Sequence, residues 1–247
     1  NIRCGVIRND VEVRRRENVE CKVTEWGMLP GQVYALEGGV RFFIQPKTGQ
    51  KTGYFYDHRD NRAALTNRVK LQENSLSVLD CFSYIGSWGL QSLKKNAQAH
   101  LTAVDSSDAA LKQLKEIAEL NGLANRVDLV EADIFKMFPA FSKPFDVVIC
   151  DPPSLTSSAK QHVKALKAYE KCFTNALRCL KSEGLIALSS CSYHVTWDEF
   201  LRCIARSAHK VSSDLQLTYF GSQAIDHPVL SSLIETRYLK CVFASKL

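Results

Sequence analysis

The sequence lacks the features that mark several common classes of protein. Its nine cysteines include no pair at Cys-x-x-Cys spacing, which excludes zinc-ribbon and thioredoxin-type motifs. No apolar run approaches the roughly 20 residues of a membrane-spanning helix, and no apolar core typical of a signal peptide lies near the first residue. Internal repeats and low-complexity segments are also missing. The odd, irregular set of cysteines indicates a reduced compartment, so we expect a cytoplasmic protein with no membrane partner.

The apolar content is sufficient for a buried core. The chain has 247 residues, 45% of them hydrophobic, which suits one large domain or one domain with a smaller appendage. Lysine and arginine number 32 against 26 acidic residues, a net charge of +6. The excess permits a polyanionic partner, although a solvated basic face is the commoner interpretation. The basic residues concentrate in the first third, at Arg3, Arg8, Arg14, Arg15, Arg16, Lys51, Arg59, Arg62, Arg68 and Lys70.

The order of apolar and helical segments predicts an α/β fold. Residues 1–70 are rich in turns between short apolar runs such as 32–36 and 40–44, which indicates a small β-hairpin extension. Residues 71–247 then alternate strand-like runs with helical patterns, which predicts a doubly wound, mostly parallel, seven-stranded Rossmann-like sheet. The expected strands are 76–80, 101–105, 127–130, 145–150, 184–189, 215–219 and 238–244, the last two pairing antiparallel at the sheet edge. The expected helices include 108–120 and about 160–180.

Acidic residues end the first two of these strand-like runs and follow the third. Asp80 precedes a turn with Gly86 and Gly89, one glycine short of the Gly-x-Gly-x-x-Gly fingerprint, so nicotinamide and flavin cofactors rank second. The Asp105 carboxylate can accept hydrogen bonds from the two hydroxyls of a ribose, and the Asp133 carboxylate can accept one from an adenine amino group. Each acid taken alone is more often a helix cap or a loop charge. Their recurrence after successive strands favours an adenosine ligand.

These segments carry a family resemblance. The stretch 80–89, Asp105, Asp133 and Asp151-Pro152-Pro153 resemble the consecutive motifs of class I S-adenosylmethionine-dependent methyltransferases. Over nearly the whole chain, a narrower resemblance is to the large-subunit ribosomal RNA cytosine-C5 methyltransferase family. The motifs that carry it are residues 48–62, Phe82-Ser83-Tyr84-x-Gly86, Ser190-Cys191-Ser192, Asp226-His227-Pro228 and Glu235-x-Arg237-Tyr238-Leu239-Lys240. Trp88 departs from the pattern, because smaller side chains are expected in that turn.

The resemblance implies a cofactor and partners. The cofactor is expected to be S-adenosylmethionine, with S-adenosylhomocysteine as product, and the partner ribosomal RNA, bound by a homodimer. Members of the family carry an N-terminal PUA domain before a β-hairpin region, so we expect that this chain lacks that domain.

The resemblance also implies cofactor contacts. Residues 50–62 mix basic and aromatic side chains, which suits the cofactor's carboxylate and its adenine or the target base, although a polar hairpin capped by charge pairs is the alternative. The expected cofactor-binding residues are Lys51, Thr52, Gly53, Phe55, Arg59, Phe82, Ser83, Tyr84, Gly86, Asp105, Ser106, Asp133, Ile134 and Asp151. No metal site is expected.

Methylation at cytosine C5 needs a nucleophile on the enzyme. C5 is unreactive until a thiolate adds to C6, after which C5 attacks the sulfonium methyl. Cys191 and Asp151 each follow a strand-like run and are expected to meet at the carboxyl edge of the sheet. We hypothesise that Cys191 is the nucleophile and that Asp151 hydrogen-bonds the base at N3 or N4, with the base for the C5 proton unassigned. A buried core position is the alternative for Cys191, and is expected for Cys150.

Two other functions stay open. An N-methyltransferase acting on RNA, DNA or a small molecule would not need Cys191, but such enzymes typically place an aromatic residue where this chain has Ser154. A non-catalytic RNA-binding assembly factor is disfavoured by the joint presence of Asp105, Asp151 and Cys191. The role of Asp226-His227-Pro228 is left open. For C5 chemistry the target cytosine must leave its stack, in a single-stranded loop or by base flipping.

Overall fold

A seven-stranded sheet forms the centre of the molecule. The computed structural model describes residues 2–11, 14–15, 17–49, 53–71, 74–156 and 161–247. The strand order is β10-β11-β9-β8-β5-β6-β7, with β11 antiparallel to both neighbours and the other pairs parallel. The strands are β5 (Ser77–Cys81), β6 (His100–Asp105), β7 (Val127–Glu131), β8 (Phe145–Cys150), β9 (Leu180–Ser190), β10 (Leu215–Gly221) and β11 (Lys240–Lys246). The predicted sheet, including its antiparallel edge, is confirmed.

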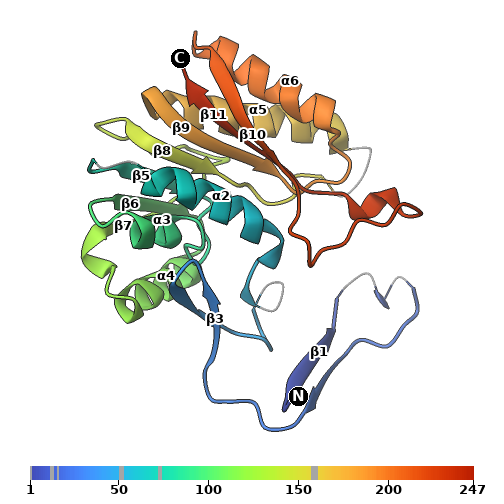
Figure 1. Ribbon diagram of the computed structural model, residues 1–247. Helices are drawn as coiled ribbons and strands as arrows, with labels where there is room; N and C mark the ends of the chain where they lie inside the picture. The colour runs from blue at the N-terminus through green and yellow to red at the C-terminus, as the bar shows by residue number, and fades with distance from the viewer. Residues whose placement is uncertain (1, 12–13, 16, 50–52, 72–73, 157–160) are drawn as a thin grey trace.

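Helices cover both faces of this sheet (Figure 1). On one face α2 (Arg59–Lys70), α3 (Gly89–Lys95) and α4 (Asp108–Leu120) share a buried apolar core with the strands. On the other, α5 (His162–Arg178) and α6 (Trp197–Lys210) form a second core. Short 3-10 turns lie at η2 (Tyr56–His58), η3 (Ala124–Arg126) and η5 (Ile234–Thr236). Among the described residues, no helix is long and apolar enough to cross a bilayer.

Local capping fixes the ends of two helices. Ser107 accepts a hydrogen bond from the Ala110 amide at 3.2 Å, so α4 begins at Asp108, as predicted. A capping box begins α6, where the Thr196 hydroxyl accepts from the Glu199 amide and the Glu199 carboxylate accepts from the Thr196 amide. The sequence analysis did not identify α6, although this signature is present in the sequence.

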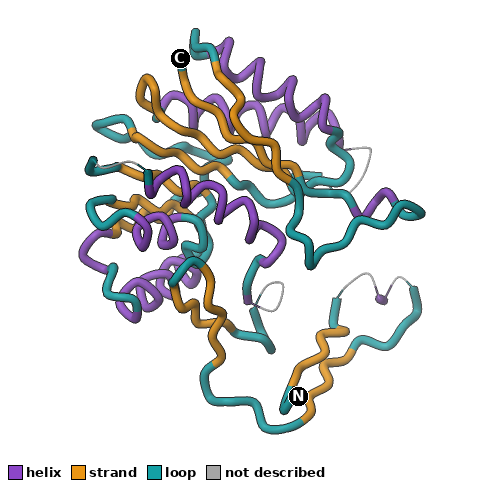
Figure 2. Tube along the Cα trace, in the orientation of Figure 1, coloured by secondary structure: helices purple, strands orange, loops and turns teal. Residues whose placement is uncertain are grey.

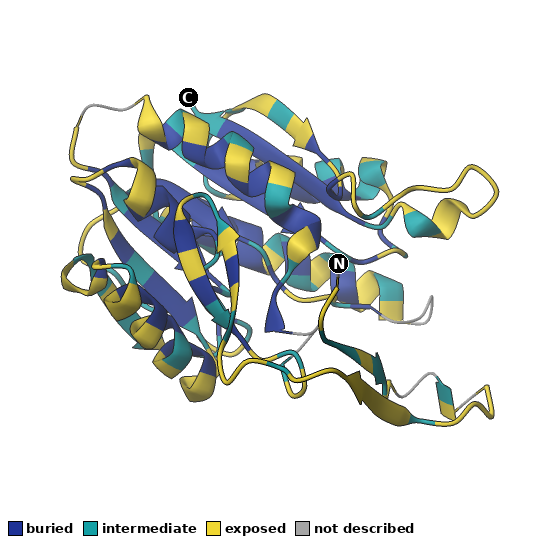
Figure 3. Cartoon of the chain, turned by 60° about the horizontal axis from the view of Figure 1, so that its bottom comes forward, coloured by how far each residue is buried: buried dark blue, intermediate teal, exposed yellow. Residues whose placement is uncertain are grey.

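Two hairpins precede the sheet. β1 (Gly5–Asn9) pairs with β2 (Lys22–Trp26), and β3 (Val33–Glu37) pairs with β4 (Val40–Ile44). The β3–β4 hairpin contributes to the α2–α4 core, whereas the β1–β2 hairpin stands apart from the helices (Figure 2). In that hairpin β2 is exposed and β1 is mostly half-buried (Figure 3).

The expected β-rich extension over residues 1–70 also contains a helix. Leu65 and Val69 of α2 are fully buried against the main core, because their spacing of four residues places them on one helical face. The expectation that residues 59–70 belong to a β-rich segment is therefore wrong. The boundary itself, between 1–70 and 71–247, stays a prediction.

Candidate active site

A cleft of about 470 Å³ lies where the parallel strands end. Segments that follow β5, β6, β7, β8 and β9 line it, together with residues from the 55–62 segment. Loops distant in sequence converge here because the carboxyl ends of parallel strands share one edge of the sheet. The volume is in the range of small-molecule sites in proteins.

Most of the predicted site residues meet in this cleft. Those that line it are Phe55, Phe82, Ser83, Tyr84, Asp105, Ser106, Asp133, Ile134, Asp151 and Cys191. Gly53, Gly86 and Arg59 are not among its lining residues, and Arg59 instead pairs with Asp226 at 2.7 Å. Lys51 and Thr52 lie outside the described residues. Any direct role of these five in cofactor binding stays a prediction.

The turn after β5 has an unusual backbone. Phe82, Tyr84 and Gly86 all have positive φ angles, of 62°, 49° and 78°. Residues other than glycine rarely adopt this backbone conformation. At Gly86 a Cβ atom would lie 2.9 Å from the Leu114 side chain, so a larger residue there would crowd that side chain and be strained at this φ angle. The residues of this turn that line the cleft are Phe82, Ser83 and Tyr84.

Asp80 does not face the ligand with the other two acids. It is fully buried, and its Oδ2 accepts a hydrogen bond from the Gly89 amide at 3.0 Å, at the start of α3. Burial raises the pKa of Asp80 to about 8. The expectation that all three strand-end acids contact an adenosine ligand is therefore wrong for Asp80, whose hydrogen bond joins the start of α3 to β5.

Asp105 is held by main-chain donors. The Tyr84 amide donates to its Oδ2 at 2.8 Å and the Ser107 amide to its Oδ1 at 2.9 Å. An ionised carboxylate has about four acceptor positions, so two remain for a diol such as a ribose. The predicted role of Asp105 fits this geometry.

Asp133 follows β7 in a similar local turn. Its Oδ1 accepts from the Phe135 amide at 3.0 Å and from the Lys136 amide at 3.3 Å. Burial opposes ionisation, but bonds from Lys136 and Phe135 outweigh it and lower the pKa of Asp133. Next to it Ile134 is buried, and the Phe82 and Phe135 rings lie 5.1 Å apart. This end of the cleft therefore combines an oriented carboxylate with apolar and aromatic surface, which fits an adenine ring.

Asp151 is held by side chains from three elements. The Trp88 indole donates to its Oδ2 at 3.0 Å, the Ser189 hydroxyl donates to its Oδ1, and His58 Nε2 lies 3.3 Å from the same oxygen. Burial raises the pKa of this carboxyl, but His58, Ser189 and Trp88 outweigh it and lower the pKa of Asp151 to about 2. Trp88, the departure from the expected motif, is thus one of the donors that lower the pKa of Asp151.

A fixed amide sets the tautomer of His58. Asn61 Nδ2 donates to the Ser222 carbonyl at 3.0 Å, and Tyr219 donates to Asn61 Oδ1 at 3.0 Å, so the amide orientation is determined. Asn61 Nδ2 also lies 3.1 Å from His58 Nδ1, which therefore accepts. A neutral ring then carries its proton on Nε2, which lies 3.3 Å from Asp151 Oδ1 without forming a hydrogen bond in the described structure. Sequence analysis missed His58 and Asn61, although both lie in the 48–62 motif.

Arg62 anchors this same segment. It is fully buried, donates to Glu37 at 2.6 and 2.9 Å and to the Phe55 carbonyl at 2.8 Å, and its guanidinium lies 5.0 Å from the Tyr54 ring. Two bonds to one carboxylate satisfy its charge within the protein. A structural role for Arg62 therefore accounts for its contacts, in place of the suggested cation for a cofactor carboxylate.

Cys191 follows β9 and is partly exposed in the cleft. The next residue is well fixed, because the Ser192 hydroxyl bonds to Tyr169 at 2.8 Å and to Ser154 at 3.1 Å. Cys150 is instead fully buried, and burial raises the pKa of its thiol well above the usual range, which confirms its predicted place in the core.

The Asp226-His227-Pro228 turn is tied to the segment that carries His58. Asp226 bonds to Arg59 and lies 3.1 Å from His227 Nδ1, and the Ala224 amide donates to the Asp57 carbonyl at 2.8 Å. The turn thereby helps to fix the 55–62 segment beside the cleft. No group of three or more His, Cys, Asp or Glu side chains placed to hold a metal ion occurs in the described part of the chain.

Comparison with known proteins identifies the family. Residues 72–232 match a family model described as a methyltransferase domain, so the chain belongs to this family of methyltransferases. Its fold is that of S-adenosylmethionine-dependent methyltransferases, which confirms the predicted fold class and cofactor.

Individual relatives are more specific than the family model. Curated relatives named ribosomal RNA large subunit methyltransferase I, from Pseudoalteromonas atlantica and Pseudoalteromonas translucida, are 33% and 35% identical over 239 residues. Each match covers 94% of this chain and 59% of the relative, so the chain spans well under two thirds of their length. A Streptococcus mutans structure described as a SAM-dependent methyltransferase superimposes with a TM-score of 0.76 at 25% identity, covering 93% of this chain and 59% of that one. A methyltransferase solved with S-adenosylhomocysteine gives 0.74 at 26%, covering 90% and 58%.

Proposed function

We propose that this protein methylates C5 of a cytosine in large-subunit ribosomal RNA through a covalent adduct at Cys191. The observation that carries the proposal is that Cys191 and the ionised Asp151 line the same cleft as Asp105 and Asp133. A nucleophile and an acceptor for the base thus lie beside residues suited to an adenosine. The choice of ribosomal RNA rests on the names of the relatives.

The cleft suits S-adenosylmethionine at its β6–β7 side. The Asp105 carboxylate is oriented toward a ribose by two backbone amides, and the Ile134 and Phe82 side chains offer an apolar surface to an adenine. Phe82, Ser83 and Tyr84, from the turn with positive φ angles, line the cleft beside this surface. When bound, the cofactor supplies an electrophilic methyl group on a sulfonium.

In this proposal Cys191 is the nucleophile and Asp151 is the hydrogen-bond acceptor for the base. The Cys191 thiolate forms a bond to C6, which moves an electron pair toward C5 and makes that carbon nucleophilic. After C5 has gained the methyl group, loss of its proton returns an electron pair to the C5–C6 bond and expels the thiolate. Asp151 accepts two hydrogen bonds, from Trp88 and Ser189, and His58 Nε2 lies 3.3 Å from its Oδ1, so acceptor positions remain for the base. An ionised carboxylate accepts but does not donate, so this arrangement favours the cytosine N4 amino group over N3.

The segment after Asp151 supports C5 over the exocyclic nitrogen. Ser154 occupies the position where an aromatic side chain would stack on a flipped base, and its hydroxyl bonds to Ser192 and Thr156. These bonds connect the loop after β8 to the loop that carries Cys191. The N-methyltransferase alternative has no comparable support from the side chains in the cleft.

The test compares wild type, Cys191→Ser and Cys179→Ser with labelled cofactor and unmodified large-subunit ribosomal RNA. The methylated nucleoside is identified by mass spectrometry. Cys179 is also partly exposed but does not line the cleft, so it is a matched control. We expect 5-methylcytidine from wild type and Cys179→Ser, and none from Cys191→Ser. A nitrogen-methylated product, or methylcytidine from Cys191→Ser, would refute the proposal.

Three further expectations are not tested by the structure or by the comparisons. A PUA domain ahead of residue 1, a homodimer and a cytoplasmic location all stay predictions.

A further inference from the structure

Lys240, at the start of β11, is a buried cation next to the proposed nucleophile. Lys240 is only 3% exposed. In the pairing of β11 with β9 it lies opposite Ser190, the residue before Cys191. Its ammonium donates to the Ser192 carbonyl at 2.8 Å and to the Val195 carbonyl at 2.6 Å. Among the described residues, no carboxylate forms an ion pair with it. A buried ammonium is costly unless it is matched by a negative charge.

The charged groups around Lys240 indicate where that negative charge arises. Burial lowers the pKa of Lys240 to about 8, and of the neighbouring charges Cys191 acts on it most strongly, ahead of Arg237 and Glu199. Glu199 is already engaged by Thr196 and His162. An ammonium has three donors, so one remains after the two carbonyl bonds.

We propose that Lys240 is a positioning residue that fixes the Cys191 loop and stabilises the Cys191 thiolate. The proposal deepens the proposed function and rests on it. Two phenols, Tyr169 and Tyr238, also interact with Cys191, but burial raises the pKa of both, to about 12 for Tyr169, so neither supplies charge at neutral pH. Lys240 thus provides the positive field that a thiolate needs.

The test measures the reactivity of the thiol without cofactor or RNA. Iodoacetamide alkylation of Cys191 is followed by peptide mass spectrometry from pH 5 to 10 in wild type, Lys240→Met, Lys240→Arg and Lys246→Met. Lys246 is the matched control, because it lies on the same strand and also donates to two carbonyls, those of Leu177 and Leu180. We expect the midpoint of the profile to rise by about one to two pH units in Lys240→Met alone.

An unchanged midpoint in a folded Lys240→Met protein overturns the proposal. Thermal unfolding establishes folding, and Lys240→Gln takes the place of the methionine variant if that one does not fold. A profile that shifts equally in Lys246→Met also overturns it. The outcome is separate from the identity of the methylated product, so failure of this inference and failure of the proposed function give different results.

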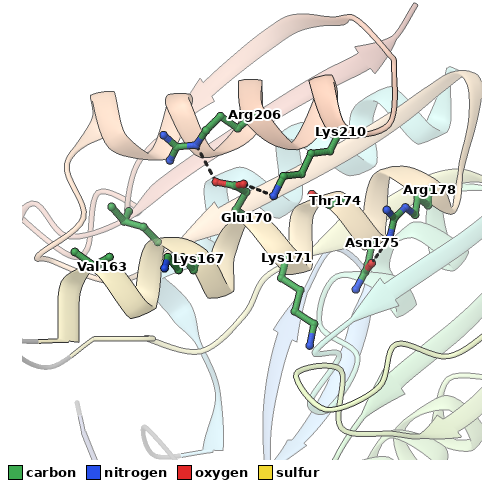
Figure 4. Close-up of a pocket in the computed structure, with 10 residues that line it drawn as sticks. Val163, Lys167, Glu170, Lys171, Thr174, Asn175, Arg178, Arg206 and Lys210 are labelled. Atoms are coloured by element: carbon green, nitrogen blue, oxygen red, sulfur yellow. Dashed lines mark hydrogen bonds and ion pairs between the residues drawn. The ribbon is translucent and has the colours of Figure 1, made fainter.

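A second observation concerns a groove between α5 and α6 (Figure 4), one of whose lysines, Lys171, donates to the carbonyl of Phe135 at 2.8 Å. Its volume is about 790 Å³, and five basic side chains line it against a single acidic one, Glu170. The basic residues are Lys167, Lys171, Arg178, Arg206 and Lys210. Glu170 bonds to Arg206 at 2.8 Å and to Lys210 at 2.5 Å, so its charge is already matched. The groove keeps an excess of positive charge.

A buried hydroxyl lies in the same groove. Thr174 is 5% exposed, and its Oγ1 has no hydrogen-bond partner in the described structure. An unsatisfied buried donor is uncommon in proteins and indicates a missing partner. A hydroxyl donor among cations suits the oxygens of a phosphate. Lys167 and Arg178 are separated by about three helical turns, roughly 16 Å, enough to follow several phosphates.

We infer that this groove binds the phosphodiester backbone of the RNA substrate outside the target nucleotide, an inference that rests on the proposed function. The test measures binding of ribosomal RNA as a function of salt for wild type, a Lys167→Gln/Lys171→Gln/Arg178→Gln variant, and Thr174→Val. Three exposed lysines on α3 and α4, changed together as Lys94→Gln/Lys95→Gln/Lys115→Gln, provide the control with equal net charge. We expect the triple groove variant to reduce the slope of log affinity against log salt by about two, and Thr174→Val to weaken binding by about threefold.

Equal losses in groove and control variants would contradict the inference, since net charge alone would then explain them. Loss of binding to a polyglutamate probe, with RNA binding unchanged, would assign the groove to an acidic protein and also contradict it. If wild type neither binds nor methylates RNA, the proposed function itself fails. If wild type does both and the groove variant is unaffected, only the groove assignment fails.

Discussion

Two carboxylates at the same edge of the sheet, Asp105 and Asp151, are held in different ways. Asp105 accepts from two backbone amides, whereas Asp151 is surrounded by Trp88, Ser189 and His58 side chains. Backbone donors come with the strand-end turn and survive most substitutions. Side-chain donors come from residues far apart in sequence, so substitutions can change the pKa and the orientation of the carboxylate. The first arrangement suits binding and the second suits catalysis.

The sharpest way to break this comparison is to neutralise Asp151. In Asp151→Asn the acceptor for the base is replaced by an uncharged amide, and we expect kcat to fall by about 1,000-fold. Cofactor affinity, measured by calorimetry, should change less than about threefold, because the cofactor contacts we assign lie on the β6–β7 side. A large loss of cofactor affinity with kcat preserved would place Asp151 in cofactor binding alone.

The reciprocal change is Asp105→Ala. Loss of two hydrogen bonds to a ribose should weaken cofactor binding by about 100-fold, while 5-methylcytidine remains the product. Calorimetric titration of the cofactor measures the effect. Asp108→Ala is the control, since Asp108 is an exposed carboxylate that pairs with Lys112 on the same side of the sheet. Equal affinities in the two variants would rule out the ribose role.

Trp88→Phe sharpens the comparison by removing one donor from Asp151 and keeping an aromatic ring. The pKa of Asp151 is lowered to about 2 partly by this bond, so its loss raises that pKa and moves the acid limb of the kcat profile to higher pH. We expect the loss of kcat to be confined to acid pH, with a change of less than about threefold at neutral pH, where Asp151 stays ionised. Trp197→Phe is the control, because the Trp197 indole nitrogen has no hydrogen-bond partner in the described structure. Identical acid limbs in wild type and Trp88→Phe would contradict the account.

The smallest effect concerns stability through Asp80. Its folded-state pKa is raised to about 8 by burial, so the folded protein holds a proton that the unfolded chain releases above about pH 4. Folding stability should therefore fall as pH rises from about 4 to 8. Asp80→Asn keeps an acceptor for the Gly89 amide and should flatten the fall, changing the pH dependence of Tm by about 5 °C. The same slope in both proteins, measured by calorimetric scans, would show that Asp80 is ionised when folded.

Local signals in the sequence predicted the framework of the fold. The Ser107 cap and the Asn121-Gly122 stop gave α4 at its observed bounds, and apolar runs gave the seven strands. β9 begins at Leu180, four residues before the predicted start, because Leu180 pairs with Phe145 across an irregular register. Helix α6 was missed despite the Thr196 and Glu199 capping box.

The acids that act through local turns were likewise predictable, whereas the surroundings of Asp151 were not. Asp105 and Asp133 follow strands, and their partners lie within a few residues or on the neighbouring strand end. Trp88 and His58 reach Asp151 only through the folded sheet, from 63 residues away in the case of Trp88. No periodicity or spacing marks such a contact in a single sequence.

Covalent trapping tests the central claim most directly. RNA whose target cytosine is replaced by 5-fluorocytidine cannot lose its C5 substituent as a proton, so the adduct formed during methyl transfer persists. Wild type is incubated with this RNA and S-adenosylmethionine, and the modified peptide is identified by mass spectrometry. We predict one stable protein–RNA adduct, located at Cys191 and missing from Cys191→Ser. An adduct at another residue, or methylation of unmodified RNA with no adduct on the fluorinated one, would contradict the account.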